Sequence, residues 1–214
     1  MNSLISFIMG LMVSVYPFEN STQETVEEAQ DRYQSIAQDL VDVVYDSNED
    51  PLFSGEYGRL KTAMTLLSIA SFESGFRRDV DFGELRGDKG ASVCLMQINV
   101  GQTDQEGRSY KRFILDSSGY YNVVFDRTQG WGSEDLVDDR QKCFRVALAI
   151  ARKSFAKCHE SDDLNKLKLY TSGSCYFGSI SSRQRMSRAF NWFSNISNDI
   201  TFSDDQVLSY FQLD

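Results

Sequence analysis

One carboxylate in the sequence is placed where it could move a proton. Glu73 lies in "SFESGF" (71–76), between Phe72 and Phe76, at the predicted C-terminal end of an apolar helix. The negative end of the helix dipole opposes ionisation there, and aromatic neighbours add desolvation. Both effects raise the pKa of Glu73, as a general acid near neutral pH requires. Most glutamates at helix ends are simply exposed, so these residues alone favour the simpler interpretation.

Two later segments change that balance, namely "SVCLMQIN" (92–99) and "KLYTSGS" (168–174). Together with "SFESGF", they resemble the lytic transglycosylases of the goose-lysozyme-like superfamily, soluble-transglycosylase type. The pattern of that family is an E-S pair ending a core helix, then a G-L-M-Q-I segment, then an A-Y-N-x-G turn. The helical segment "LVDDRQKCFRVALAIARKSF" is also similar to a helix of the family. The resemblance covers about residues 25–195.

The resemblance implies that Glu73 is the catalytic acid and base. It also implies a substrate-binding set, which comprises Ser74, Ser92, Met96, Gln97 and Tyr170. In the family, the segment that includes Leu95 and Ile98 floors the saccharide cleft, Met and Gln flank the sugar, and the tyrosine hydrogen-bonds near the carboxylate. The chemistry so implied calls for no cofactor and no metal.

The sequence departs from the family pattern at two positions. Cys94 replaces the glycine of G-L-M-Q, where its side chain could crowd the cleft, and Thr171 replaces the asparagine after the tyrosine. These departures motivate an alternative, a lysozyme-fold structural or glycan-binding protein without catalysis. A Cys94–Cys175 or a Cys158–Cys175 disulfide is conceivable, but free buried thiols are the default expectation.

The expected substrate is the glycan strand of peptidoglycan, cleaved with formation of a 1,6-anhydro-muramic acid end. Ordinary hydrolysis, as in a lysozyme-type muramidase, usually needs a second carboxylate. The candidates for it are Asp79, Asp81, Glu84 and Asp88. They lie in a charged loop for which a solvated interpretation is favoured, so the transglycosylase is the leading hypothesis and the hydrolase the alternative.

Composition sets the fold class and excludes several partners. The chain has 214 residues, 41% of them hydrophobic and 13% aromatic, with 2 prolines and 14 glycines. These values favour helices over a many-turned β architecture. The family resemblance implies a mainly α fold, α+β and lysozyme-like, with a short β-hairpin or loop region beside the cleft. A net charge of −9 argues against nucleic acid as the main partner. His159 is the only histidine and no C-x-x-C occurs, so a metal site is not expected. The arginines at 183, 185 and 188 are interpreted as the solvated face of a late helix.

Three parts are predicted along the chain: an apolar N-terminal docking segment (1–21), the lysozyme-like domain (22–195) and an acidic C-terminal tail (196–214). The first part has no basic residue before Arg32, so it does not read as an export signal. Helices are predicted at 22–46 with Ser21 or Thr22 as N-cap, 59–72, 138–157, 163–171 and 181–195. Residues 77–93 are expected to form loops or a short hairpin.

Residues 101–135 look irregular and contain aromatic side chains that could line a glycan groove or form the core of an insertion. These are Tyr110, Phe113, Tyr120, Tyr121, Phe125 and Trp131. A substrate outside the cytoplasm and the lack of an export signal favour a bacteriophage virion protein. Its terminal segments would then pack on other virion or envelope proteins. A periplasmic enzyme with an unusual signal and a released endolysin are the alternatives.

Overall fold

The computed structural model describes residues 2–18, 23–117, 119–159 and 162–199. These residues form a mainly helical fold with two small hairpins, which confirms the predicted predominance of helix. The long helices are α1 (Asn2–Val15), α2 (Val26–Tyr45), α3 (Gly58–Glu73), α6 (Arg140–Lys157) and α8 (Ser179–Asp199). The short ones are α4 (Arg78–Asp81), α5 (Ser133–Asp138), α7 (Lys168–Ser172) and the 3-10 turns η2 (Asp88–Gly90) and η3 (Asp163–Asn165).

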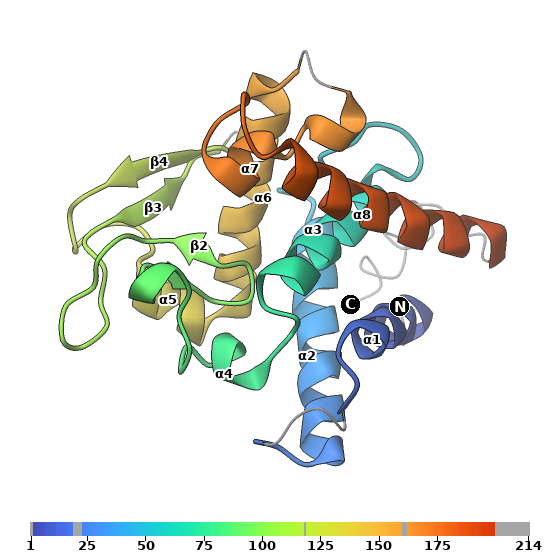
Figure 1. Cartoon of the computed structure of the whole chain (residues 1–214), viewed down its shortest axis with the longest axis horizontal. Coiled ribbons are helices and arrows are strands. Elements are labelled where there is room, and N and C mark those ends of the chain that lie inside the picture. Colours follow the sequence, from blue (N-terminus) through green and yellow to red (C-terminus); the bar gives the residue numbers. More distant parts are fainter. Residues whose placement is uncertain (1, 19–22, 118, 160–161, 200–214) are drawn as a thin grey trace.

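Helix α3 is the centre of the fold. It packs against α2 on one side and α8 on another, and Figure 1 shows α8 crossing it. Twelve of its residues are buried, so apolar and small side chains occupy nearly its whole circumference. A helix of this pattern has to be enclosed by others. Its observed bounds lie within one residue of the predicted 59–72, and it delivers Glu73 at its last position.

Helix α1 belongs to the same core. Leu4, Ile8 and Met12 are at most 1% exposed, and α1 packs against α2 and α3. The Tyr33 hydroxyl of α2 donates a hydrogen bond of 2.9 Å to the Tyr16 carbonyl, which fixes the chain just after α1. In the described ranges, no helix has the length and apolar character needed to cross a membrane. Residues 200–214 of the predicted tail lie outside the described residues.

The start of α2 differs from the prediction. Thr25, rather than Ser21 or Thr22, is the N-cap, because its hydroxyl accepts from the Glu28 amide at 3.2 Å. The Glu28 carboxylate accepts from the Thr25 amide in return at 2.7 Å, which completes a capping box. The predicted helix 138–157 is also divided, since Asp139 is extended and caps α6 through the Lys142 amide.

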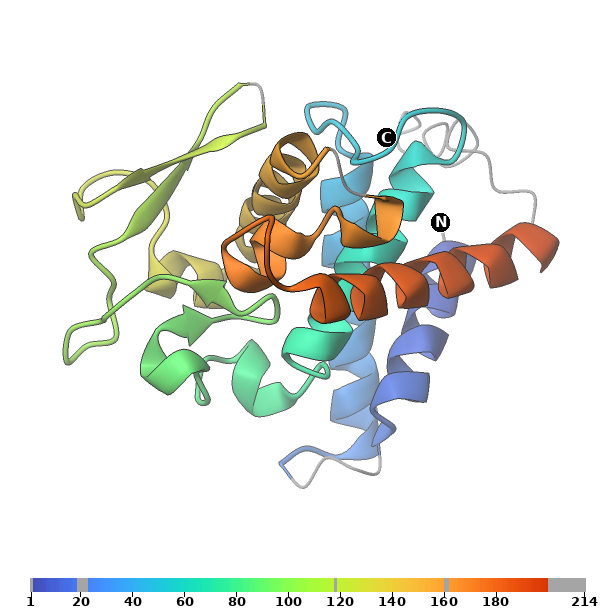
Figure 2. The same ribbon diagram turned by 45° about the horizontal axis from the view of Figure 1, so that its top comes forward.

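Both hairpins are antiparallel. Strand β1 (Ser92–Val93) pairs with β2 (Ile98–Asn99), so this hairpin begins at the end of the 77–93 segment where loops or a short hairpin were expected and lies mostly beyond it. Strand β3 (Arg112–Leu115) pairs with β4 (Tyr121–Val124) in residues predicted to be irregular. Four-residue strands are too short to show a clear alternation of apolar and polar residues, which is why the pattern missed them. Figure 2 shows the β3–β4 hairpin extending away from the helices.

Candidate active site

The three motifs meet at one cavity of about 530 Å³, between the helices and the β3–β4 hairpin. Glu73 reaches it from the end of α3, Gln97 from the turn before β2, and Tyr170 from α7. Phe113 and Tyr121 of the hairpin also line it. This volume lies in the range of small-molecule and saccharide-sized sites. The fold therefore brings together side chains that are about 100 residues apart in sequence.

Glu73 is a partly buried carboxyl group with opposing influences on it. Its side chain is 22% exposed, and burial raises its pKa above the ordinary value because the charged form is poorly solvated. The negative charge of Asp88 raises the pKa further, whereas the guanidinium of Arg185 lowers it. Arg185 Nη2 donates to Glu73 Oε1 at 2.7 Å. Within the described residues Glu73 Oε2 has no hydrogen-bond partner, so it remains able to bind a ligand.

The prediction that the arginines at 183, 185 and 188 form a solvated helix face is wrong for Arg185. Its side chain is 11% exposed, lies over the Phe72 ring at 5.0 Å and pairs with Glu73. Arg188, one turn later on α8, also covers Phe72 but donates to the Ser71 hydroxyl. The pairing joins residues 112 positions apart, and nothing in the local sequence of α8 indicates it.

Tyr170 links the second and third motifs. Its hydroxyl donates a hydrogen bond of 2.9 Å to the Met96 carbonyl, and its side chain lines the same cavity as Glu73. Burial raises the pKa of this hydroxyl well above its ordinary value, and the negative charge of Glu73 adds to the rise. Tyr170 is therefore a neutral donor that ties one cavity wall to the other.

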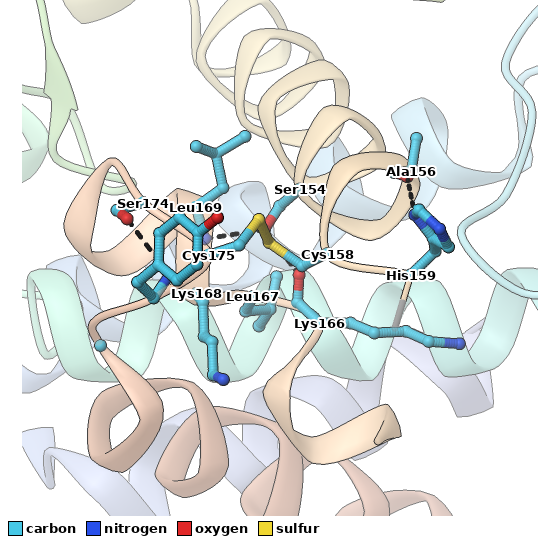
Figure 3. The surroundings of a disulfide bond; sticks show 12 residues. Ser154, Ala156, Cys158, His159, Lys166, Leu167, Lys168, Leu169, Ser174 and Cys175 are labelled. Atoms are coloured by element: carbon cyan, nitrogen blue, oxygen red, sulfur yellow. Dashed lines mark hydrogen bonds between the residues drawn. A yellow bond between two sulfur atoms is a disulfide. The ribbon is translucent and has the colours of Figure 1, made fainter. Parts of the chain in front are cut away.

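Helix α7, which carries Tyr170, is anchored to α6. Ser154 Oγ donates to the Lys166 carbonyl at 2.6 Å and accepts from the amides of Leu169 and Tyr170 at 3.1 and 3.3 Å. A disulfide joins Cys158, at the end of α6, to Cys175 in the connection between α7 and α8 (Figure 3). The short helix, too short to be stable alone, is therefore fixed at both ends.

A second disulfide, between Cys94 and Cys143, joins the other cavity wall to the start of α6. Among the described residues no cysteine is free, so the default expectation of free thiols is wrong. The Cys94–Cys175 pairing is wrong too, whereas Cys158–Cys175 is present. Cys94 has φ +60°, a conformation that favours glycine, and is 3% exposed. Its side chain points into the core and does not crowd the cavity.

Left-handed backbone is concentrated beside the site. In the part of the chain that the structure describes, the non-glycine residues with positive φ are Phe76, Asp88, Lys89, Cys94 and Gln97. All of them lie in the segment that leaves Glu73 and forms one wall of the cavity. Such conformations cost on the order of 1–3 kcal/mol each and cluster at functional sites. The segment is thus held in a demanding shape by its surroundings.

Three of the expected substrate-binding side chains do not line the cavity. Ser74 Oγ donates to the Ala70 carbonyl and accepts from the Phe76 amide, which closes the end of α3. Ser92 Oγ donates to Asp88 Oδ2 at 2.6 Å. Met96 is fully buried and offers its carbonyl to Tyr170. Their contacts support the site, whereas Gln97 and Tyr170 are part of its surface.

The four candidates for a second catalytic carboxylate differ in whether they line the cavity. Asp79 pairs with Arg77, buried Asp81 with Arg140 at 2.8 Å, and Glu84 with Arg78 at 2.9 Å. Those three do not line the cavity, and their ion pairs are structural or exposed. Asp88 alone of the four shares the cavity with Glu73.

The aromatic residues within 101–135 fall into two groups, those that line the cavity and those that do not. Phe113 and Tyr121 line the cavity, so they support the groove interpretation for this part of the hairpin. Tyr110, Tyr120 and Phe125 are exposed, and Phe125 is 75% exposed. Sequence reasoning missed Lys111, which lies just before β3 and also lines the cavity. Its position next to an aromatic residue was the only available signal.

Another cavity, of about 450 Å³, lies between α2, α4 and α5 and is rich in carboxylates, including Asp39 and Asp81. Arg140 pairs with both of them, and no motif residue reaches this cavity. Within the described ranges, no three His, Cys, Asp or Glu side chains are grouped so as to hold a metal ion. We therefore assign the candidate site to the cavity beside Glu73.

No family model, no curated protein and no solved structure matches this chain.

Proposed function

We propose that this chain is a lytic transglycosylase with a lysozyme-like fold, which cleaves peptidoglycan between N-acetylmuramic acid and N-acetylglucosamine. The observation that carries the proposal is the position of Glu73, a carboxyl group of raised pKa in a cavity that Gln97 and Tyr170 also line. The same three residues fall on the three motifs of the family that the sequence resembles. A helix-end carboxylate without a catalytic role would not need these distant segments around it.

The mechanism assigns two duties to Glu73. The protonated group gives its proton to the glycosidic oxygen that leaves C1 of muramic acid, which breaks the bond between that oxygen and C1. The resulting carboxylate removes the proton from the C6 hydroxyl of the same sugar, and O6 bonds to C1 to give the 1,6-anhydro ring. The acetamido oxygen of the sugar stabilises the positive charge that develops at C1.

The surroundings of Glu73 suit both duties. Burial and Asp88 favour the neutral acid before the proton transfer, because each penalises a negative charge at Glu73. Arg185, at 2.7 Å, stabilises the carboxylate that forms after it. Glu73 Oε2 is the oxygen available to the substrate, since Oε1 accepts from Arg185. No protein nucleophile is needed, and Asp88 has no assigned step in this reaction.

Asp88 supports a second candidate, a muramidase that releases reducing ends. It lines the same cavity as Glu73 and keeps one carboxylate oxygen, Oδ1, without a hydrogen-bond partner among the described residues. A carboxylate so placed could activate water or stabilise the sugar cation. The ion pair with Arg185 is the feature that favours the inactive alternative, because it occupies one oxygen of Glu73.

The deciding experiment is digestion of purified peptidoglycan by the wild type and by Glu73→Gln, with the soluble products identified by mass spectrometry. Anhydro products from the wild type alone support the transglycosylase. Products heavier by one water support the muramidase. Binding without release of any product by either protein would overturn both enzyme proposals and favour a glycan-docking protein. Glu84→Gln, an exposed carboxylate outside the cavity, is the control for loss of charge.

We also propose that the protein acts outside the cytoplasm, as a component of a phage particle that opens the cell wall locally. Two disulfides support an oxidising place of action, because they rarely persist in the cytosol. The three fully buried side chains of α1 support its retention with the domain. The proposed partners are the glycan strand and other virion or envelope proteins, with the periplasmic enzyme and the released endolysin as alternatives. Fractionation of purified particles, with detection of this chain, tests the location.

A further inference from the structure

Lys111 is a cation that lines the same cavity as Glu73. It directly precedes β3, and its ammonium donates a hydrogen bond of 2.6 Å to the Asn99 carbonyl. The ammonium also lies 5.3 Å from the centre of the Phe113 ring. The side chain is half-buried and lines the same cavity as Glu73 and Asp88. Among the described residues that line this cavity, it is the one positively charged side chain.

The partners of Lys111 do not balance its charge. Within the described ranges, no carboxylate lies within ion-pair distance of its ammonium, and burial lowers its pKa without any acidic group to oppose the effect. Two buried arginines of the fold do have acidic partners: Arg112 pairs with Asp135 at 2.6 Å, and Arg152 pairs with Glu49 at 2.7 Å. The chain has 31 acidic and 22 basic residues, so a shortage of carboxylates does not explain the difference.

A half-buried ammonium without a counter-charge is costly in the empty site, and an anionic ligand would offset that cost. We infer that Lys111 binds a carboxylate of the substrate, and that it lets the enzyme distinguish muramic acid strands from neutral glycans. This inference rests on the proposed function. A lysine suits the task, because its ammonium is a compact point charge on a flexible stem that can follow a mobile carboxylate.

Peptidoglycan offers two sources for that carboxylate. On peptide-free muramic acid, the lactyl group itself ends in a free carboxylate. On peptide-bearing strands, the lactyl carboxyl is an amide, and the free carboxylates belong to the stem peptide. Chitin oligomers, made of N-acetylglucosamine alone, carry neither group. The three ligands therefore separate recognition of the sugar from recognition of the charge and of its source.

The test measures the affinity of each ligand by calorimetry in the Glu73→Gln background, which binds without turnover. We expect added Lys111→Met to weaken binding of a carboxylate-bearing glycan about tenfold, as for a hydrogen bond to a charged group. Its affinity for chitin oligomers should stay within about twofold, and Lys111→Arg should retain most of the difference. Loss confined to peptide-free strands identifies the lactyl carboxylate, and loss confined to peptide-bearing strands identifies the stem.

Lys153→Met is the matched control. The Lys153 ammonium lies 4.4 Å from the centre of the Tyr121 ring, and Lys153 does not line the cavity. The substitution therefore removes one positive charge near the cavity but leaves the proposed contact between Lys111 and the ligand intact. The inference is overturned if Lys111→Met leaves all affinities unchanged, weakens chitin equally, or acts no more strongly than Lys153→Met. If the Glu73→Gln protein binds none of the three glycans, the proposed function itself fails, and the role of Lys111 with it.

Discussion

Arg185 Nη2 lies 2.7 Å from Glu73 Oε1, so the candidate acid is paired with a cation from a helix 112 residues later in the chain. The pair is partly buried, with side-chain exposures of 11% and 22%. Arg185 opposes the rise that burial causes in the pKa of Glu73. The balance between the neutral and charged forms of the acid therefore depends on α8.

Replacing Arg185 by methionine should raise the pKa of Glu73 further, because the positive charge that lowers it is lost. A general acid is active while protonated, so the fall in activity at high pH should move to higher pH. We expect kcat to drop about tenfold as the carboxylate loses its partner, about 1.4 kcal/mol. Arg188→Met, which removes the same charge one turn away, should leave the profile in place. Equal shifts for both variants would contradict a specific role of Arg185.

Asp88→Asn should shift the profile in the opposite direction. The negative charge of Asp88 raises the pKa of Glu73, so its removal lowers that pKa and brings the high-pH fall in activity to lower pH. A transglycosylase should keep its anhydro products, whereas a muramidase should lose about 100-fold or more in kcat. Rates over a pH series, with mass spectrometry of the products, measure both effects. A profile identical to that of wild type would show that Asp88 does not influence Glu73.

Tyr170→Phe should destabilise the protein by about 1 kcal/mol, the usual value of one hydrogen bond. The variant removes the donor to the Met96 carbonyl and keeps the ring. The free energy of unfolding from urea denaturation measures the loss. Tyr176→Phe is the control, because Tyr176 is 90% exposed, and it should change the free energy of unfolding by less than about 0.5 kcal/mol. Two equal results would argue against the link between the walls.

Both disulfides should form in protein folded under oxidising conditions. Alkylation of the denatured, unreduced chain should then label none of its four cysteines. Replacing Cys94 and Cys143 by serine should cost about 4 kcal/mol, and replacing Cys158 and Cys175 about 3 kcal/mol, because the loops span 49 and 17 residues. Denaturant unfolding of both double variants measures these losses. Complete alkylation before reduction would refute the pairing.

The sequence predicted what depends on local patterns. Helix α3 is long and apolar on most of its circumference, which favours a central helix, and its end was placed within one residue. The start of α2 was missed by three residues or more, although T-x-x-E at 25–28 is a capping-box pattern. Two adjacent candidate caps competed with it, and only the backbone geometry decided between them.

The arrangement of the site could be predicted only where a motif marked it. Glu73, Gln97 and Tyr170 were found through the resemblance, and all three line the cavity. Arg185 and Lys111 make their contacts with segments that are distant in the sequence. The local charge pattern around Arg185 indicated a solvated helix face, and the local pattern around Lys111 indicated no site at all. The cysteine pairing could not be predicted either, because it depends on which segments lie beside the two ends of α6 in the folded protein.

Helix α6 holds a cysteine at each end, and each is bonded to a different wall of the cavity. Cys143 and Cys158 are fifteen positions apart, or about 22 Å along a helix. One inserted residue would turn the second cysteine by about 100° and carry it away from its partner. The length of α6 between Cys143 and Cys158 therefore sets the distance between the two segments that the disulfides hold. A change in the number of residues between Cys143 and Cys158 would therefore put at least one of the two disulfides out of reach.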